Sequence, residues 1–266
     1  YKRQVLARTL RPEPETFRAS ATSGAVTAGP ARVRVVEDAS RRVYHVELEP
    51  EVKLSFAGPP GEPASSGPLE EPLWDLAPLD LEVAGTIAVP VGDGRKETLP
   101  FTGRGVHDHG AGPRSPVPGV RSWAWGWAHA WEFAVGWRQV VLESGEVDTV
   151  LLVDRESRPF VGEAVSSRRF RPHFSVLGVP HRRQWRLDAP SGVGLAVERA
   201  ATLASSPVGM RFLTNIRLAV QEGRGPIRLV DGLGLSSVAR PVRARRAAWR
   251  WMARARDIWN GQRARR

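Results

Sequence analysis

An aspartate between two histidines is the part of the sequence best suited to acid–base chemistry. Asp108 lies between His107 and His109, in the glycine-rich stretch 101–112. A carboxyl group held in apolar surroundings has a raised pKa and stays protonated near neutrality, so we predict that Asp108 protonates an alkene. The structural alternative is that Asp108 pairs with His107, His109 or Arg104 and fixes a turn.

The two histidines of this stretch are separated by one residue, so on a strand both rings would point to the same face. That spacing permits metal ligation. His129 is the one further candidate ligand that the sequence suggests, so we favour the alternative in which His107 and His109 hydrogen-bond to the backbone or to Asp108. The sequence therefore predicts supporting histidines around Asp108 and no metal site.

A row of aromatic residues follows this stretch. Between residues 121 and 142, large side chains occupy odd positions with a period of two, which indicates one face of extended chain with a turn near 128–130. We predict that this face lines a cavity, with these substrate-binding walls: Trp74, Trp123, Trp125, Trp127 and Trp131. The alternative is that the tryptophans fill a core.

His129 interrupts the aromatic row. In a cavity it would donate a hydrogen bond to a substrate carbonyl or carry a proton, and we include it among the catalytic candidates. The alternative is a histidine that faces solvent at a turn.

The elements that must position these residues are predicted to be strands. Apolar residues alternate with polar ones in short segments, and 26 Gly and 22 Pro punctuate them, which is typical of an all-β chain. Besides 121–142, we expect strands at 33–36, 43–48, 51–56, 81–89, 97–103, 149–153, 160–165, 173–177, 184–187, 193–199, 211–220 and 227–230. We divide the chain into two halves, 1–103 and 104–241, and a tail, 242–266.

The stretch Phe101–Gly112 resembles the Gly-Tyr-His-Asp-His-Asn-Trp-Gly signature of the carotenoid 1,2-hydratase family, which includes hydroxyneurosporene synthases, AttH-like proteins and decalin-forming pericyclases. The similarity extends to residues 72–74, 81–86 and 123–126. The resemblance implies two lipocalin-like (calycin) β-barrel halves and a lyase or cyclase that needs no cofactor. Here Val106, Gly110 and Ala111 replace the family's Tyr, Asn and Trp, so we expect a substrate other than a carotenoid.

The tail is predicted to be a basic amphipathic helix. Ala248, Trp251 and Ile258 share one helical face with other apolar residues, and nine Arg stand against one acid over 242–266. We favour docking of this helix on the protein over peripheral contact with an anionic membrane. The tail holds most of the net charge of +11, and no nucleic-acid motif accompanies it, so we predict no nucleic-acid partner.

The absence of Cys excludes disulfides and thiolate chemistry. We see no phosphate loop, dinucleotide fingerprint or nucleophile elbow, which favours chemistry without a cofactor. The sequence thus predicts a cytoplasmic hydratase, cyclase or pericyclase that acts on a hydrophobic polyene, terpenoid or polyketide in a Trp-lined cavity. The alternative is a carrier of a hydrophobic metabolite that catalyses nothing.

Overall fold

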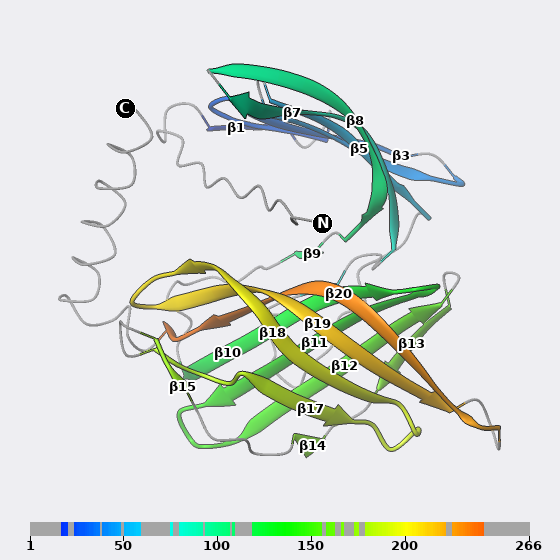
Figure 1. Ribbon diagram of the computed structural model, residues 1–266, viewed down its shortest axis with the longest axis vertical. Helices are drawn as coiled ribbons and strands as arrows, with labels where there is room; N and C mark the ends of the chain where they lie inside the picture. The colour runs from blue at the N-terminus through cyan, green and yellow to red at the C-terminus, as the bar shows by residue number, and fades with distance from the viewer. Residues whose placement is uncertain are drawn as a thin grey trace. The chain divides into compact units, whose positions relative to one another are not determined.

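The computed structural model describes fourteen stretches of the chain, and their strands form antiparallel sheets (Figure 1). The described residues are 17–20, 24–37, 39–48, 51–59, 75–76, 80–92, 94–106, 108–109, 119–155, 158–162, 166–167, 173–175, 179–221 and 225–241. The all-β prediction is confirmed. The predicted helix over 242–266 lies outside these residues, and within them no helix is long and apolar enough to span a membrane.

The chain divides into two compact units, residues 1–64 with 76–108 and residues 65–75 with 109–266. Unit 1 contains a seven-stranded sheet in which each strand pairs with the next in the order β1-β2-β3-β4-β5-β7-β8. Its strands are β1 (Phe17–Ser20), β2 (Ala25–Ala28), β3 (Ala31–Glu37), β4 (Arg42–Leu48), β5 (Val52–Gly58), β7 (Leu81–Gly92) and β8 (Arg95–Gly105). The strands predicted at 33–36 and 43–48 form a hairpin, because Val33 pairs with Val46 and Val36 with Val43.

Two short sheets accompany the larger ones. β6 (Asp75–Leu76) pairs with β9 (Asp108–His109), and β15 (His173–Phe174) pairs with β16 (Pro180–His181). The pair β15–β16 belongs to unit 2 and holds two of the chain's six histidines.

Unit 2 contains a nine-stranded antiparallel sheet that curls into a half-barrel (Figure 1). Its order is β13-β12-β11-β10-β20-β19-β18-β17-β14. The strands are β10 (Val120–Ala130), β11 (Phe133–Leu142), β12 (Val147–Arg155), β13 (Arg158–Gly162), β14 (Ser166–Ser167), β17 (Gln184–Asp188), β18 (Gly194–Ser205), β19 (Gly209–Gln221) and β20 (Ile227–Ala239). Among the described strands this order ends at β13 and β14, so the sheet is a half-barrel where the sequence predicted a barrel.

The core of unit 2 lies on the inner face of this curl. The rings of Trp137 on β11 and Trp185 on β17 are 6.4 Å apart between centroids, although four strands separate β11 from β17 in the sheet order. Such strands meet only if the sheet bends round on itself. Around these rings pack fully buried aliphatic side chains that include Val135, Leu151 and Leu218, and their burial out of water supplies the main stabilising free energy.

The hairpin between β10 and β11 splits the predicted aromatic row. Ala130 pairs with Phe133, so the turn consists of Trp131 and Glu132, and odd positions of β10 lie opposite even positions of β11. Directly paired residues share a face of the sheet. The expectation that odd positions share one face therefore holds within each strand and fails across the turn: Trp125 and Trp127 lie on the outer face, whereas Trp137 lies on the inner face.

β20 is longer than the segment predicted at 227–230, because glycines allow it to lie close against β10. Gly232 and Gly234 fall where a Cβ atom would collide with the backbone oxygens of His129 and Trp127. Glycine lowers the strand propensity of a segment, which is why sequence patterning misses this one. The close approach joins the last strand of the half-barrel to its first, β10.

Candidate functional site

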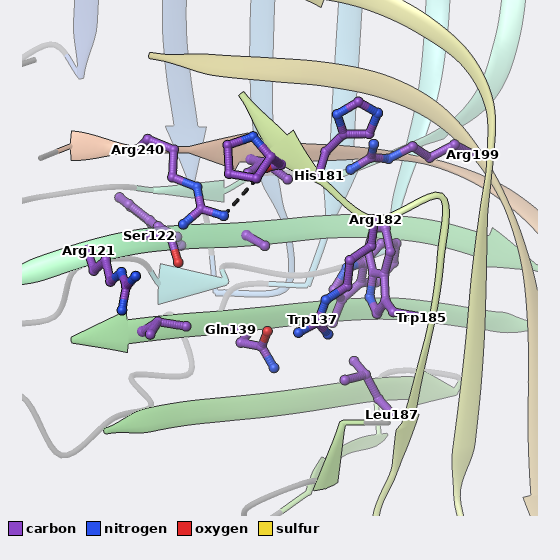
Figure 2. A pocket seen from close by; sticks show the side chains of 15 residues that line it. Arg121, Ser122, Trp137, Gln139, His181, Arg182, Trp185, Leu187, Arg199 and Arg240 are labelled. Atoms are coloured by element: carbon purple, nitrogen blue, oxygen red, sulfur yellow. Dashed lines mark hydrogen bonds between the residues drawn. The ribbon is translucent and has the colours of Figure 1, made fainter. Parts of the chain in front are cut away.

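A cavity of about 380 Å³ opens on the inner face of unit 2 (Figure 2). Its walls come from β10, β11, β17, β18 and the end of β20, with Pro180 and His181 of β16 at one side. The apolar part of the lining includes Trp137, Trp185 and Leu187, and its cations include Arg199. A volume of this size is in the usual range of small-molecule sites, which is about 300–1,000 Å³.

Two tryptophans form the aromatic wall. Trp137 is 1% exposed and meets Trp185 edge to face, with 64° between the ring planes. Trp137 has room for its ring because Gly126 lies opposite it on β10, where a Cβ atom would collide with the indole. The pair gives this side of the cavity an apolar aromatic lining.

Arg199 brings a buried positive charge to this wall. It follows Leu195 and Val197 on the inner face of β18, and the strand-pair register shifts directly after it. Its guanidinium carbon lies 3.4 Å from the centroid of Phe212 and 5.8 Å from that of Trp185. All three guanidinium nitrogens are buried, and none has a hydrogen-bond partner within the part of the chain that the structure describes. Burial lowers the pKa of Arg199 to about 9, so the group is still charged at neutral pH.

His181 is the titratable base of the cavity. Its Nδ1 lies 3.1 Å from the carbonyl oxygen of Val179, an arrangement in which Nδ1–H donates and Nε2 is left as an acceptor. Burial lowers the pKa of His181, the hydrogen bond to Val179 opposes that shift, and the charges of Arg199 and His173 add to it. The ring is therefore neutral at pH 7 and can accept a proton.

The charge around the cavity has one sign. Arg121, Arg182, Arg199 and Arg240 line it together with His181, and no acid is among the described residues of its wall. Arg240 reaches across to the carbonyl oxygen of Pro180 at 3.5 Å, the contact drawn in Figure 2. A partly enclosed site lined by cations raises the local concentration of anions.

A second hollow, of about 430 Å³, lies on the sheet of unit 1. Arg41 and Glu82 line it and pair with each other at 3.2 Å. No aromatic side chain lines it among the described residues. We therefore take the cavity of unit 2 as the candidate site.

The tryptophans predicted as substrate-binding walls do not lie together in the structure. Trp123 pairs with Val140 and so shares the outer face with Trp125, whose ring centroid is 4.9 Å away, although Trp123 also borders the cavity at its edge. Trp125 and Trp127 are half-buried on the outer face and do not line this cavity. Trp131 is 78% exposed in the hairpin turn, and Trp74 lies outside the described residues.

The predicted catalytic residues are only partly described. His129 is half-buried on the outer face, and its ring meets that of Trp127 edge to face at 6.3 Å. Asp108 and His109 form strand β9, whose side chains are not described, and His107 lies outside the described residues. Their roles stay predictions. In the described ranges, no group of three or more His, Cys, Asp or Glu could hold a metal ion.

Sequence reasoning missed Arg199, His181 and Trp185. For Arg199 a signal exists: Leu195, Val197 and Arg199 alternate with outward residues, so an arginine stands where the pattern demands an apolar side chain. For His181 we find no such signal, since its position depends on the short pairing of β16 with β15.

The comparison with solved structures gives a likeness in fold. The crystal structure of a "putative AttH" from Nitrosomonas europaea matches 81% of this chain and 70% of its own, with 14% identity and a TM-score of 0.55. The resemblance predicted from residues 101–126 is thereby confirmed for the fold. Kievitone hydratase from Nectria haematococca matches 81% of this chain and 84% of its own at 10% identity, but its TM-score of 0.42 is too low to support an inference. The sequence matches no protein-family model and no curated protein.

Proposed function

We propose that this protein is a hydratase or cyclase that needs no cofactor and acts on a small unsaturated molecule in the cavity of unit 2. The observation that carries the proposal is His181, a neutral base that lies beside two tryptophans and whose Nε2 has no hydrogen-bond partner among the described residues. Enclosed apolar walls with a few polar groups are typical of binding sites for organic molecules.

The volume of the cavity limits the size of the substrate. A cavity of 150 Å³ accepts benzene, so at the same ratio 380 Å³ would hold roughly 15 non-hydrogen atoms. A C10 to C15 terpenoid or a one- or two-ring aromatic compound is of this size. A long carotenoid or polyketide chain would extend well beyond the cavity.

The proposed reaction is addition to an alkene that is conjugated to an electron-withdrawing group. Nε2 of His181 takes a proton from water while the water oxygen bonds to the β-carbon, and the alkene electron pair moves onto the conjugated group. The α-carbon then takes the proton back from His181, so that water has been added overall and the base is regenerated. A hydroxyl group of the substrate in place of water would close a ring by the same transfers.

Asp108, with His107 and His109 as its supports, is a separate candidate acid, and the replacement Asp108→Asn tests it independently of the cavity. The resemblance of residues 101–112 supports that role. If Asp108→Asn leaves both turnover and binding unchanged, the acid role is wrong.

The second candidate function is a carrier that binds the same ligand without reaction. The observation that favours it is the edge-to-face pair Trp137 and Trp185, which provides a binding surface without any reactive group.

The two functions are separated by the variant His181→Gln. Small conjugated enones of 10 to 15 carbons are incubated in deuterated water, and deuterium incorporation and water addition are followed by mass spectrometry. For an enzyme we expect a loss of about 100-fold or more in rate, because general-base catalysis contributes that much, with binding by tryptophan fluorescence nearly unchanged. The matched control is His45→Gln, which replaces an exposed histidine of unit 1. Turnover that survives His181→Gln would refute the proposed base, and tight binding without turnover in the wild type would establish the carrier.

A further inference from the structure

We infer that the ligand of the unit 2 cavity carries a carboxylate group that pairs with Arg199. This inference concerns the same cavity as the proposed function and rests on it. It replaces the neutral polyene predicted from the sequence with a small aromatic or terpenoid acid.

The first argument is the missing partner of a buried cation. A guanidinium group has five N–H donors, and those of Arg199 meet no acceptor among the described residues. Stacking on Phe212 at 3.4 Å attracts the cation to a ring face but supplies no acceptor in the plane of the group. Buried charges in folded proteins are otherwise paired, so this one indicates a partner that arrives with the ligand.

The second argument is the geometry of Arg199. Its guanidinium plane is supported by Phe212, and Figure 2 shows the side chain reaching from β18 toward His181. An arginine held in this way can donate two parallel hydrogen bonds from one edge to the two oxygens of a carboxylate. The ring of the ligand would then face Trp185, whose centroid is 5.8 Å from the guanidinium carbon.

The third argument is a second unpaired polar group beside the arginine. Thr214 lies opposite Arg199 in the pairing of β18 with β19 and is fully buried. Its hydroxyl has no hydrogen-bond partner among the described residues. Ser236, which pairs with Phe212 and so lies on the same inner face, is likewise buried with no hydrogen-bond partner for its hydroxyl among the described residues. Unsatisfied polar groups on a largely apolar face indicate a polar partner rather than packing.

The fourth argument is charge. The described wall of the cavity has four arginines and no acid, so nothing in it would repel an anion. Arg121 is exposed at its edge and adds to the attraction for an approaching acid. The lowered pKa of Arg199 agrees with this view, because burial is its cause and the cation is desolvated.

The test compares an acid with a neutral molecule of the same shape. We would titrate the wild-type protein at pH 7.5 with 2-naphthoate and with 2-naphthamide, and likewise with cinnamate and cinnamamide, following the quenching of tryptophan fluorescence. The acids are expected to bind about 10- to 100-fold more tightly than the amides, the range for hydrogen bonds to a charged group.

Arg199→Met should remove this preference and leave binding of the amides within a few-fold of wild type. Arg199→Lys keeps the charge without the paired donors and should retain part of the preference. Arg217→Met is the matched control. Arg217 is exposed, does not line the cavity, and pairs with Asp231 at 2.8 Å between Nε and Oδ1. Without ligand, Arg199→Met should also raise the midpoint of thermal unfolding, since it removes a desolvated charge that has no partner among the described residues.

The possible outcomes distinguish this inference from the proposed function. If acids and amides bind equally to the wild type, or if Arg199→Met keeps the preference, the carboxylate inference is overturned while the cavity stays a binding site. If neither acids nor amides bind, the proposed function falls as well. A preference that Arg199→Met abolishes and Arg217→Met preserves supports the inference.

Discussion

Each face of the nine-stranded sheet holds an arginine, and the two arginines differ in the partners that neighbouring strands give them. On the outer face Arg138 is 1% exposed and donates a hydrogen bond to Asp148 on the adjacent strand at 2.7 Å. On the inner face no described acid accompanies Arg199. An arginine whose partner is built into the next strand stabilises the fold. An arginine for which the described residues provide no such partner is the one to which we assign a ligand.

The largest effect is expected when the paired arginine is removed. Arg138→Met would leave Asp148 half-buried without this partner, since the aspartate side chain is 18% exposed. We expect the free energy of unfolding to fall by about 3 kcal/mol, as is usual when one member of a buried pair is lost. Urea denaturation measures it. If Arg199→Met lowered the free energy of unfolding by the same amount, the two arginines would not differ in the way proposed.

The role of Trp137 on the inner face can be tested by filling the space that Gly126 leaves for its ring. Gly126→Ala would place a methyl group against the indole and within 2.6 Å of the backbone oxygen of Leu235. We expect a loss of about 1–3 kcal/mol in the free energy of unfolding, as in other overpacked cores, and weaker binding of 2-naphthoate. Gly103→Ala, on an exposed strand of unit 1, is the control and should change neither. Unchanged binding in Gly126→Ala would separate Trp137 from the ligand.

In the turn between β10 and β11, one substitution is expected to stabilise the protein. Trp131 has φ of 52° at the first turn position, the pattern of a type II′ turn, in which glycine is preferred. Trp131→Gly should stabilise the protein by about 0.5–1 kcal/mol, because a bulky residue is strained there and its side chain is largely exposed. Thermal unfolding measures the gain. We expect no change in 2-naphthoate binding, and a clear loss would restore Trp131 as a binding residue.

The smallest effect is a dependence of stability on pH. His181 binds its proton less readily in the fold than its ordinary pKa of 6.5 implies, so between that value and the folded pKa the unfolded chain carries more protons. The free energy of unfolding should therefore decrease as the pH falls below 6.5. His181→Phe should make this decrease shallower. Bound 2-naphthoate should do the same, because an anion on Arg199 offsets the charge that disfavours a protonated His181.

Sequence patterning was sufficient for the strands. Alternation of apolar and polar residues located β3, β4, β7, β11, β12 and most of β18 and β19, because burial on one face of a sheet imposes that period whatever the topology. It failed at β20, where glycines replace large side chains. It also failed at the β10–β11 turn, because two turn residues, Trp131 and Glu132, reverse the parity of the faces.

The same sequence patterns predicted few of the residues that line the candidate site. Trp123 was predicted as a wall and borders the cavity, but Trp185, Arg199 and His181 come from segments 58 to 76 residues further along the chain. They meet Trp137 only because the sheet curls. A local period shows which face a side chain shares with its neighbours on one strand, and not which distant strand lies across from it.

The sequence by itself determined the all-β class, most strands and the likeness in fold to AttH, since these depend on local patterns and on a short motif at 101–126. The tertiary structure decided which aromatic residues surround the cavity and that an arginine without a partner among the described residues lies among them. The physical reason is that burial of a charge is a property of its surroundings, and for Arg199 those are assembled by β11, β17, β18 and β19 together.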